Sequence, residues 1–152
     1  MTARDAKTLY QDLVVEHGRS PRNEGALACA THEATAKNPL CGDRVTVRVR
    51  VEAGTVREAR FEARGCMIAR ASASMMTEAI TGRGVDDARE LVRTLDALVT
   101  GDPPPADVGT LEPLRGVREF PARRGCVTLA WHALAQALGR PAPTGAGTPG
   151  GV

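Results

Sequence analysis

The chain has 152 residues, of which 42% are apolar, 25% charged and only 3% aromatic, and its net charge is +2. This size and balance are those of one globular domain with a core of aliphatic side chains. The small net charge gives no reason to expect nucleic acid or a membrane surface as a partner. No apolar stretch is long enough to span a bilayer, and the N-terminus lacks the hydrophobic segment of a signal peptide, so we expect a cytoplasmic protein.

The first half of the chain predicts one helix and a small sheet. Apolar spacing predicts a helix over 8–17, and a weakly alternating first strand follows over 26–36. The clearest β signal lies at 44–51, where valine takes every second place. The alternating run at 58–64 follows a turn and predicts an antiparallel hairpin. One face of this hairpin would be exposed to water, and helices must cover the opposite face.

The second half of the chain predicts helices over 67–81, about 87–99, 111–117 and 127–138. Asp87 and Glu90 have the spacing of a capping box at the start of the second of these. From Gly139 onward the chain consists almost entirely of small residues and proline, so we expect a disordered tail over 140–152 after one domain over 1–139. The order of helix, short sheet and further helices indicates an α+β fold.

Three cysteines lie at the edges of predicted elements. Cys41 occurs in Asn-Pro-Leu-Cys-Gly-Asp, Cys66 in Arg-Gly-Cys-Met-Ile and Cys126 in Arg-Arg-Gly-Cys-Val. Thiols in a reducing compartment are more often free or metal-bound than disulfide-bonded. Together with Asp43 they would make a four-coordinate site for zinc or iron, if the fold brings them together. Asp43 as a turn cap and the cysteines as small buried hydrophobes are the alternatives, because no Cys-x-x-Cys pair is present.

The neighbours of these cysteines suggest how a thiolate would be stabilised. Cys66 is expected at a helix N-terminus, where the dipole and free amides favour the thiolate. Arg123 and Arg124 precede Cys126 and could lower a thiol pKa or bind an anionic group, although for Arg124 we favour a solvated position.

The remaining cysteine and the histidines are given other roles. Cys29 lies in the weak first strand and is expected to pack in the core. His17 closes the first helix, where a cation suits the dipole. His32 and His132 are not expected to be metal ligands.

Several ordered motifs resemble the SufU-type branch of the IscU/NifU N-terminal family of iron–sulfur cluster assembly proteins. The resemblance covers roughly 9–138 and is carried by Leu9-Tyr10, His17, Ser20-Pro21-Arg22-Asn23-Glu24-Gly25, Asn38-Pro39-Leu40-Cys41-Gly42-Asp43-Arg44, Gly65-Cys66 through Met76, Gly116-Val117, and Phe120-Pro121-Ala122-Arg123 through Cys126 to Trp131.

The resemblance implies an IscU/SufU-like α+β fold in which a small antiparallel three-stranded sheet packs against several helices. It implies one metal held by Cys41, Asp43, Cys66 and Cys126, typically zinc, with iron or a [2Fe–2S] cluster as alternatives at the same ligands. It further implies a zinc-dependent sulfurtransferase role, in which Cys41 accepts persulfide sulfur, assisted by Arg123. The implied partners are a pyridoxal-phosphate cysteine desulfurase of the SufS type, one of whose histidines would replace Cys41 on the zinc, and downstream iron–sulfur scaffold proteins.

Two departures from the family pattern stand out. Gly125 occupies the place where IscU-type scaffolds usually have histidine and SufU-type proteins often have lysine. The span from Cys66 to Cys126 is longer than in IscU scaffolds, and the Leu-Pro-Pro-Val-Lys chaperone motif is missing. The longer span and the missing motif favour the SufU-type interpretation and argue against a dedicated Hsp70-type chaperone partner. A scaffold for a transient [2Fe–2S] cluster and a structural zinc domain that serves only for interaction are the alternative functions.

Overall fold

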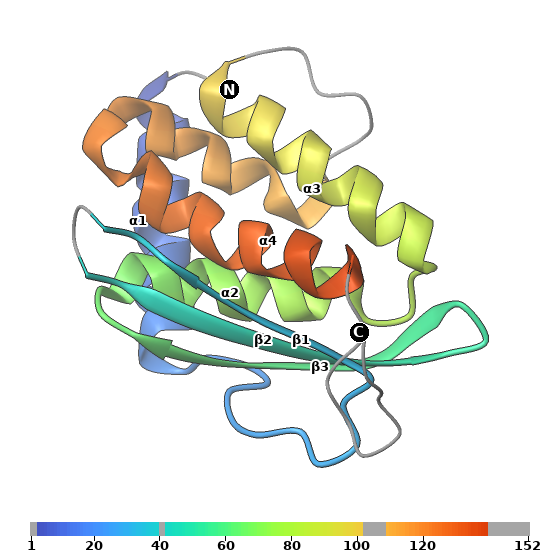
Figure 1. The fold of residues 1–152 in the computed structure, drawn as a ribbon. Coiled ribbons are helices and arrows are strands. Elements are labelled where there is room, and N and C mark those ends of the chain that lie inside the picture. Colours follow the sequence, from blue (N-terminus) through green and yellow to red (C-terminus); the bar gives the residue numbers. More distant parts are fainter. Residues whose placement is uncertain (1–2, 40–41, 102–108, 140–152) are drawn as a thin grey trace.

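The computed structural model describes residues 3–39, 42–101 and 109–139 of the chain (Figure 1). Cys41 and the predicted tail over 140–152 lie outside the described residues, so the domain boundary stays a prediction. The elements follow in the order α1 (Ala3–Arg19), β1 (His32–Lys37), β2 (Arg44–Glu52), β3 (Thr55–Arg64), α2 (Met67–Ile80), α3 (Val85–Thr100), the 3-10 segments η1 (Gly109–Glu119) and η2 (Pro121–Arg123), and α4 (Arg124–Gly139).

The sheet confirms the α+β class and the predicted hairpin. Its strands are antiparallel in the order β1-β2-β3. Val45, Val47 and Val49 are fully buried on one face, as the alternation of β2 predicts. Ala53 and Gly54 both have positive φ, 53° and 77°, which is the backbone of a type I′ turn and suits the twist of the two strands that it joins.

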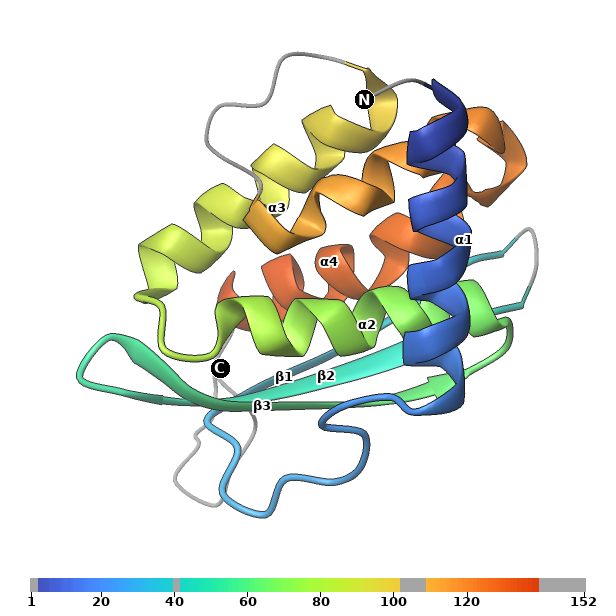
Figure 2. The ribbon, with the colours of Figure 1, turned by 180° about the vertical axis from the view of Figure 1, so that it is seen from behind.

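The described helices all lie on the valine face of the sheet (Figures 1 and 2). Helix α2 packs on β3, and α4 packs on β1 and β2. Helix α1 contacts α2 and η1, while α3 contacts α4 and η1, so they form an outer layer. The aliphatic core therefore fills the space between the sheet and α2 with α4, and a second apolar layer covers these two helices.

Helix α2 is buried along most of its length because its side chains are small. Its serines give the helix specific neighbours: Ser72 Oγ donates a hydrogen bond of 2.6 Å to the carbonyl of Val127 on α4 and accepts one of 3.0 Å from Trp131 Nε1. Trp131 is fully buried, so its indole N–H needs this partner. The hydroxyl of Ser72 thus joins α2 to α4 inside the core.

Some predicted boundaries and caps were wrong. The first strand begins at His32, six residues later than expected, and Cys29 is exposed in the preceding turn rather than packed in the core. Helix α3 begins at Val85 after the N-cap Gly84, so Asp87 does not cap it. The first helix is longer than predicted and the last begins at Arg124, which places Cys126 inside the first turn of α4.

His17 is buried in a polar network and is not the helix-end cation that its position suggested. Its Nδ1 lies 2.8 Å from Ser74 Oγ on α2, and the Arg22 guanidinium lies 3.1 Å from the ring. Burial lowers the pKa of His17, and the positive charge of Arg22 lowers it further. A neutral ring therefore joins α1 to α2.

We expect the described histidines to titrate in a definite order. The pKa of His17 is held below its ordinary value, while a hydrogen bond to Asp96 raises the pKa of His132. The contribution of neutral His17 to the free energy of unfolding is therefore complete above about pH 6.5 and is lost as the pH falls below that value. The contribution of protonated His132 is complete below about pH 6.5 and is lost as the pH rises. NMR titration of the imidazole protons should give a lower midpoint for His17 than for His132, and the reverse order would contradict the buried network.

Candidate metal centre

Asp43 is held in place by the short connection between β1 and β2. The amide of Asn38 donates a hydrogen bond of 2.8 Å to the carbonyl of Asp43, and the amide of Gly42 donates one of 2.8 Å to the carbonyl of Asn38. The side chain of Asp43 is buried, with only 3% of the residue exposed. A buried carboxylate needs donors or a cation, and this one faces two cysteines.

Cys66 lies at the junction of β3 and α2, where it is the N-cap of the helix. Its amide donates a hydrogen bond of 3.0 Å to Asp43 Oδ1, and its thiol donates one of 3.0 Å to Asp43 Oδ2. Gly65 permits this approach because it has φ +125°, and a Cβ at that position would lie 1.9 Å from Asp43 Oδ1. The glycine before Cys66 is thus a requirement of the site.

Cys126 completes the group from the first turn of α4. Its thiol is buried, and the ligand atoms of Asp43, Cys66 and Cys126 all lie within 4.8 Å of one another. Two sulfurs bound to one zinc at about 2.3 Å each can be at most about 4.6 Å apart, so small side-chain shifts suffice to put one ion at the centre. Two thiols and a carboxylate are donors that zinc and iron accept, and the described part of the proposed ligand set therefore fits such an ion.

The thiol of Cys66 is protonated more readily than the predicted helix dipole suggested. Burial raises its pKa, and the hydrogen bond to Asp43 raises it further. The Ala69 amide, 3.4 Å from the sulfur, lowers this pKa, as does the contact with Cys126, but these effects are smaller. In the metal-free protein the Cys66 thiol donates a hydrogen bond to the Asp43 carboxylate. A metal ion bound to both residues would replace this hydrogen bond and release the thiol proton.

Tyr10 lies near the two cysteines, although the sequence predicts no role for it. It stacks on Phe120, with ring centroids 5.7 Å apart, and its buried hydroxyl has no hydrogen-bond partner among the described residues. Burial, with smaller effects of Cys126 and Cys66, raises the pKa of Tyr10 to about 12. The only sequence signal was its place in the Leu9-Tyr10 motif, because no pattern of spacing relates α1 to the cysteines.

The two arginines upstream of Cys126 differ. Arg123 is exposed and lies with Tyr10 at an apolar groove of about 380 Å³. The groove is lined by Tyr10, Gln11, Val14, Val15, Ile68, Phe120 and Arg123. Arg124 is half-buried, contrary to the solvated position that we favoured, and its Nε has no partner among the described residues. The role of Arg123 in catalysis stays a prediction.

Gly125 leaves room for the side chain of Asn38. A Cβ at position 125 would lie 3.1 Å from Asn38 Nδ2, a close contact that the amide would have to relieve by moving. The position of Gly125 usually carries histidine or lysine in the resembled family. In this protein the side chain of Asn38, from the β1–β2 connection, takes up the space next to that position.

Comparison with known proteins agrees with this geometry. The family model described as "NifU-like N terminal domain" matches residues 9–140. The chain belongs to the NifU-like N-terminal domain family. The zinc-dependent sulfurtransferase SufU of Bacillus subtilis is 37% identical over 135 residues, which cover 88% of this chain and 91% of that protein. The iron–sulfur cluster assembly scaffold protein IscU of Streptococcus pyogenes is 36% identical over 88% of this chain and 85% of its own length.

A solved structure of the same type shows how far the fold of this NifU-like domain is shared. It is that of a putative iron–sulfur cluster assembly scaffold protein for the SUF system from Fervidobacterium islandicum, which superposes with a TM-score of 0.79 at 26% identity and covers 86% of this chain and 97% of that one. The predicted SufU-type identification and fold are thus confirmed. Among the described residues, no helix has the length and apolar character that a membrane crossing requires.

Proposed function

We propose that this NifU-like domain works in iron–sulfur cluster assembly as a sulfur carrier that takes persulfide sulfur from a cysteine desulfurase. The observation that carries the proposal is the convergence of Asp43, Cys66 and Cys126, from three distant segments, into one group of potential metal ligands. The names of its relatives support it, since one is a zinc-dependent sulfurtransferase and another an iron–sulfur cluster assembly scaffold.

Cys41 is the proposed sulfur acceptor and fourth ligand. It precedes Asp43 by two residues in the chain. Its thiolate would attack the outer sulfur of the persulfide on the desulfurase, forming a new S–S bond at Cys41 while the old S–S bond breaks and its electron pair leaves with the cysteine thiolate of the desulfurase. No oxidant is consumed, because one disulfide-type bond replaces another.

The described residues would prepare this exchange. Cys66 and Cys126 would supply thiolates to zinc, a redox-inert ion whose ligands exchange readily. Asp43 would be a third ligand, and the hydrogen bond from the backbone amide of Cys66 to Asp43 Oδ1 would hold the two residues together. Arg123, exposed at the groove beside Tyr10, would attract an anionic partner group.

A second candidate function is that of a scaffold for a transient [2Fe–2S] cluster. The same thiols could ligate iron, and several relatives bear the name of assembly scaffold proteins. Metal analysis of protein purified without oxygen separates the two: one tightly bound zinc in a colourless sample supports the carrier, and bound iron with visible absorption supports the scaffold.

The decisive assay measures desulfurase turnover and sulfur transfer with this protein present. Wild-type protein loaded with zinc is expected to stimulate the desulfurase and to gain one sulfur atom by intact mass. Stimulation should disappear on zinc removal and return when zinc is restored.

Two cysteine variants make this assay specific for the acceptor. Cys41→Ala is expected to lose both stimulation and the added sulfur, while Cys29→Ala, which removes an exposed thiol outside the site, should retain both. Equal stimulation by Cys41→Ala and wild type would refute the acceptor assignment.

A further inference from the structure

Three cations stand in one line across the outer face of the sheet, at the end nearest the metal centre. In the strand register, Lys37 of β1 lies opposite Arg44 of β2, and Arg44 lies opposite Arg64 of β3. All three residues are exposed, and none forms an ion pair within the part of the chain that the structure describes. We call Lys37, Arg44 and Arg64 the basic row.

The rest of the same face has its charges balanced. Arg48 is paired with Glu33 at 3.5 Å and with Glu62 at 2.5 Å. Arg50 is paired with Glu58 at 3.8 Å, and Arg60 with the same carboxylate group at 3.1 Å. Among the described cations on the outer face of the three strands, those without a counter-ion therefore lie at one end of the sheet. This is the end next to the candidate metal centre.

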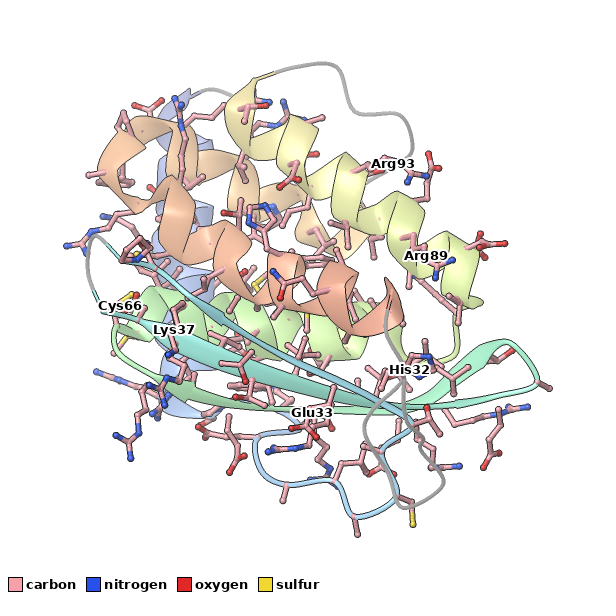
Figure 3. All side chains as sticks on the ribbon, in the orientation of Figure 1. His32, Glu33, Lys37, Cys66, Arg89 and Arg93 are labelled. Atoms are coloured by element: carbon pink, nitrogen blue, oxygen red, sulfur yellow. The ribbon has the colours of Figure 1, made fainter. Side chains whose placement is uncertain are left out.

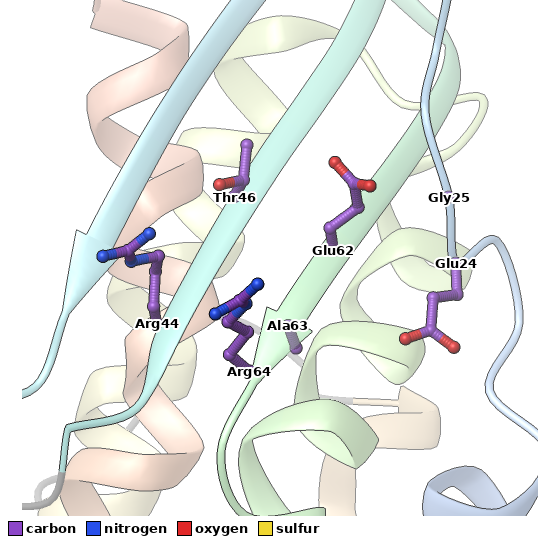
Figure 4. A pocket seen from close by; sticks show the side chains of 7 residues that line it. All are labelled: Glu24, Gly25, Arg44, Thr46, Glu62, Ala63 and Arg64. Carbon is purple, nitrogen blue, oxygen red and sulfur yellow. The ribbon is translucent and has the colours of Figure 1, made fainter.

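An open groove beside the row has no acid free to neutralise it. The groove, of about 380 Å³, is lined by Arg44 and Arg64 together with two acids, and Figure 4 shows the two arginines side by side on neighbouring strands. Both acids are already engaged, Glu62 by Arg48 and Glu24 by Arg70 at 3.7 Å. Like charges directly opposite in a sheet destabilise it, so this arrangement weakens the free protein.

The row borders the metal centre along the chain as well as in space. Lys37 precedes the connection that holds Asp43, Arg44 follows Asp43 directly, and Arg64 lies two residues before Cys66. Figure 3 shows Lys37 and Cys66 at the same end of the sheet. Anything that approaches these thiols from the sheet side meets the row.

We infer that the basic row is a docking surface for a cluster of carboxylates on the protein that delivers sulfur to this site. The inference rests on the proposed carrier function. The strands are about 4.8 Å apart, so the three charges span about 10 Å, the width of a patch of several acidic side chains. Such a patch would neutralise the row in the complex and would speed association through electrostatic attraction.

Other anions fit the row less well. A small anion would need converging donors, whereas these three side chains project from an open, exposed face. Among the described residues of this face, a nucleic acid would find three unpaired cations, and the other arginines are already bound to acids, which supports few phosphate contacts.

The test is the association rate constant of zinc-loaded protein with the cysteine desulfurase of the same organism, at about 50 mM and about 500 mM salt, where screening is weak and strong. The double variant Arg44→Glu/Arg64→Glu is compared with Arg57→Glu/Arg93→Glu. Both change the charge equally, but Arg57 and Arg93 lie away from the site and are 52% and 64% exposed.

The row variant is expected to associate at least about tenfold more slowly than wild type at low salt and to lose its salt dependence, while the control variant keeps both. Lys37→Glu, which leaves the residues next to the ligands intact, should slow association in the same direction. Zinc-dependent melting must be retained in the row variant; where it is not, Lys37→Glu decides the matter.

Four results would overturn the inference. Equal slowing by both double variants, or none by the row variants, with wild type still accepting sulfur, would overturn it alone. Wild type that neither binds the desulfurase nor accepts sulfur would overturn the carrier function as well. Binding of a labelled single-stranded oligonucleotide that depends on the row, with unchanged desulfurase association, would reassign the row to nucleic acid.

Discussion

Replacing Cys126 with alanine is expected to abolish tight zinc binding while the metal-free protein still folds. Cys126 is a buried member of the described ligand group, and alanine fits its place in the first turn of α4. A ligand that binds only the folded state at a hundred times its Kd stabilises that state by about 2.7 kcal/mol. Wild type should therefore gain about 5–10 °C in Tm from zinc, and Cys126→Ala almost nothing.

Calorimetry with and without a chelator measures this difference, and a competition titration with a chromophoric chelator gives the affinities. Cys29→Ala is the matched control because it removes an exposed cysteine and should keep the full zinc-dependent gain. A zinc-dependent gain in Cys126→Ala equal to that of wild type would show that this thiol is not a ligand.

Replacing Gly65 with alanine is expected to destabilise the protein by about 2.5–5 kcal/mol and to disrupt the metal centre. The added Cβ would overlap Asp43 Oδ1 at 1.9 Å, and the residue would be held at φ +125°. Left-handed backbone costs an alanine about 1–2 kcal/mol, and displacement of Asp43 removes hydrogen bonds to a charged group, worth about 1.5–3 kcal/mol.

Gly54→Ala separates the clash from the backbone strain. Gly54 has φ +77°, but a Cβ there meets no atom within 4 Å, so only the strain of about 1–2 kcal/mol is expected and zinc affinity should be unchanged. Urea unfolding of the metal-free proteins and zinc titration measure the two effects. Equal losses of stability in both variants, with zinc binding intact in Gly65→Ala, would mean that Asp43 is free to move aside.

The sheet could be predicted from the sequence where its pattern is strongest. The valines of β2 alternate without interruption, and this local period is enough to identify the strand and its buried face. The first strand is rich in alanine and charged residues, so its pattern did not show that it begins only at His32. Such an edge strand is defined by its pairing with β2, which depends on the tertiary structure.

The residues of the candidate site could be grouped from the sequence, but only the family resemblance predicted that they converge. Cys66 and Cys126 are 60 positions apart in the numbering of the chain, and no spacing rule relates them, since packing of α2 against α4 brings them together. The resemblance implied that both residues and Asp43 hold one metal, and the structure places their ligand atoms within 4.8 Å of one another. It gave no indication that Tyr10 would be buried beside them with a hydroxyl that has no hydrogen-bond partner in the described part of the chain. The roles of Cys41 and Arg123 stay predictions.

The charge of buried groups was the hardest property to predict. His17 has a sequence position typical of a helix-end cation, yet Ser74 and Arg22 surround it in the fold and favour the neutral ring. The thiol of Cys66 has the expected helix N-terminus, but its burial and its acid neighbour outweigh the amide. Both outcomes depend on side chains that are distant in sequence.

The hydroxyl of Ser72 has a consequence for how this domain can change over evolution. Ser72 lies on α2, the helix whose N-cap is Cys66. Its hydroxyl donates a hydrogen bond to the carbonyl of Val127 on α4, the residue that follows Cys126. The distance between the two sulfurs thus depends on the packing of α2 against α4 and on this buried hydrogen bond, and not on the length of the chain between the two cysteines. A change of chain length between the end of α3 and the start of η1 is therefore expected to leave the positions of both sulfurs unchanged.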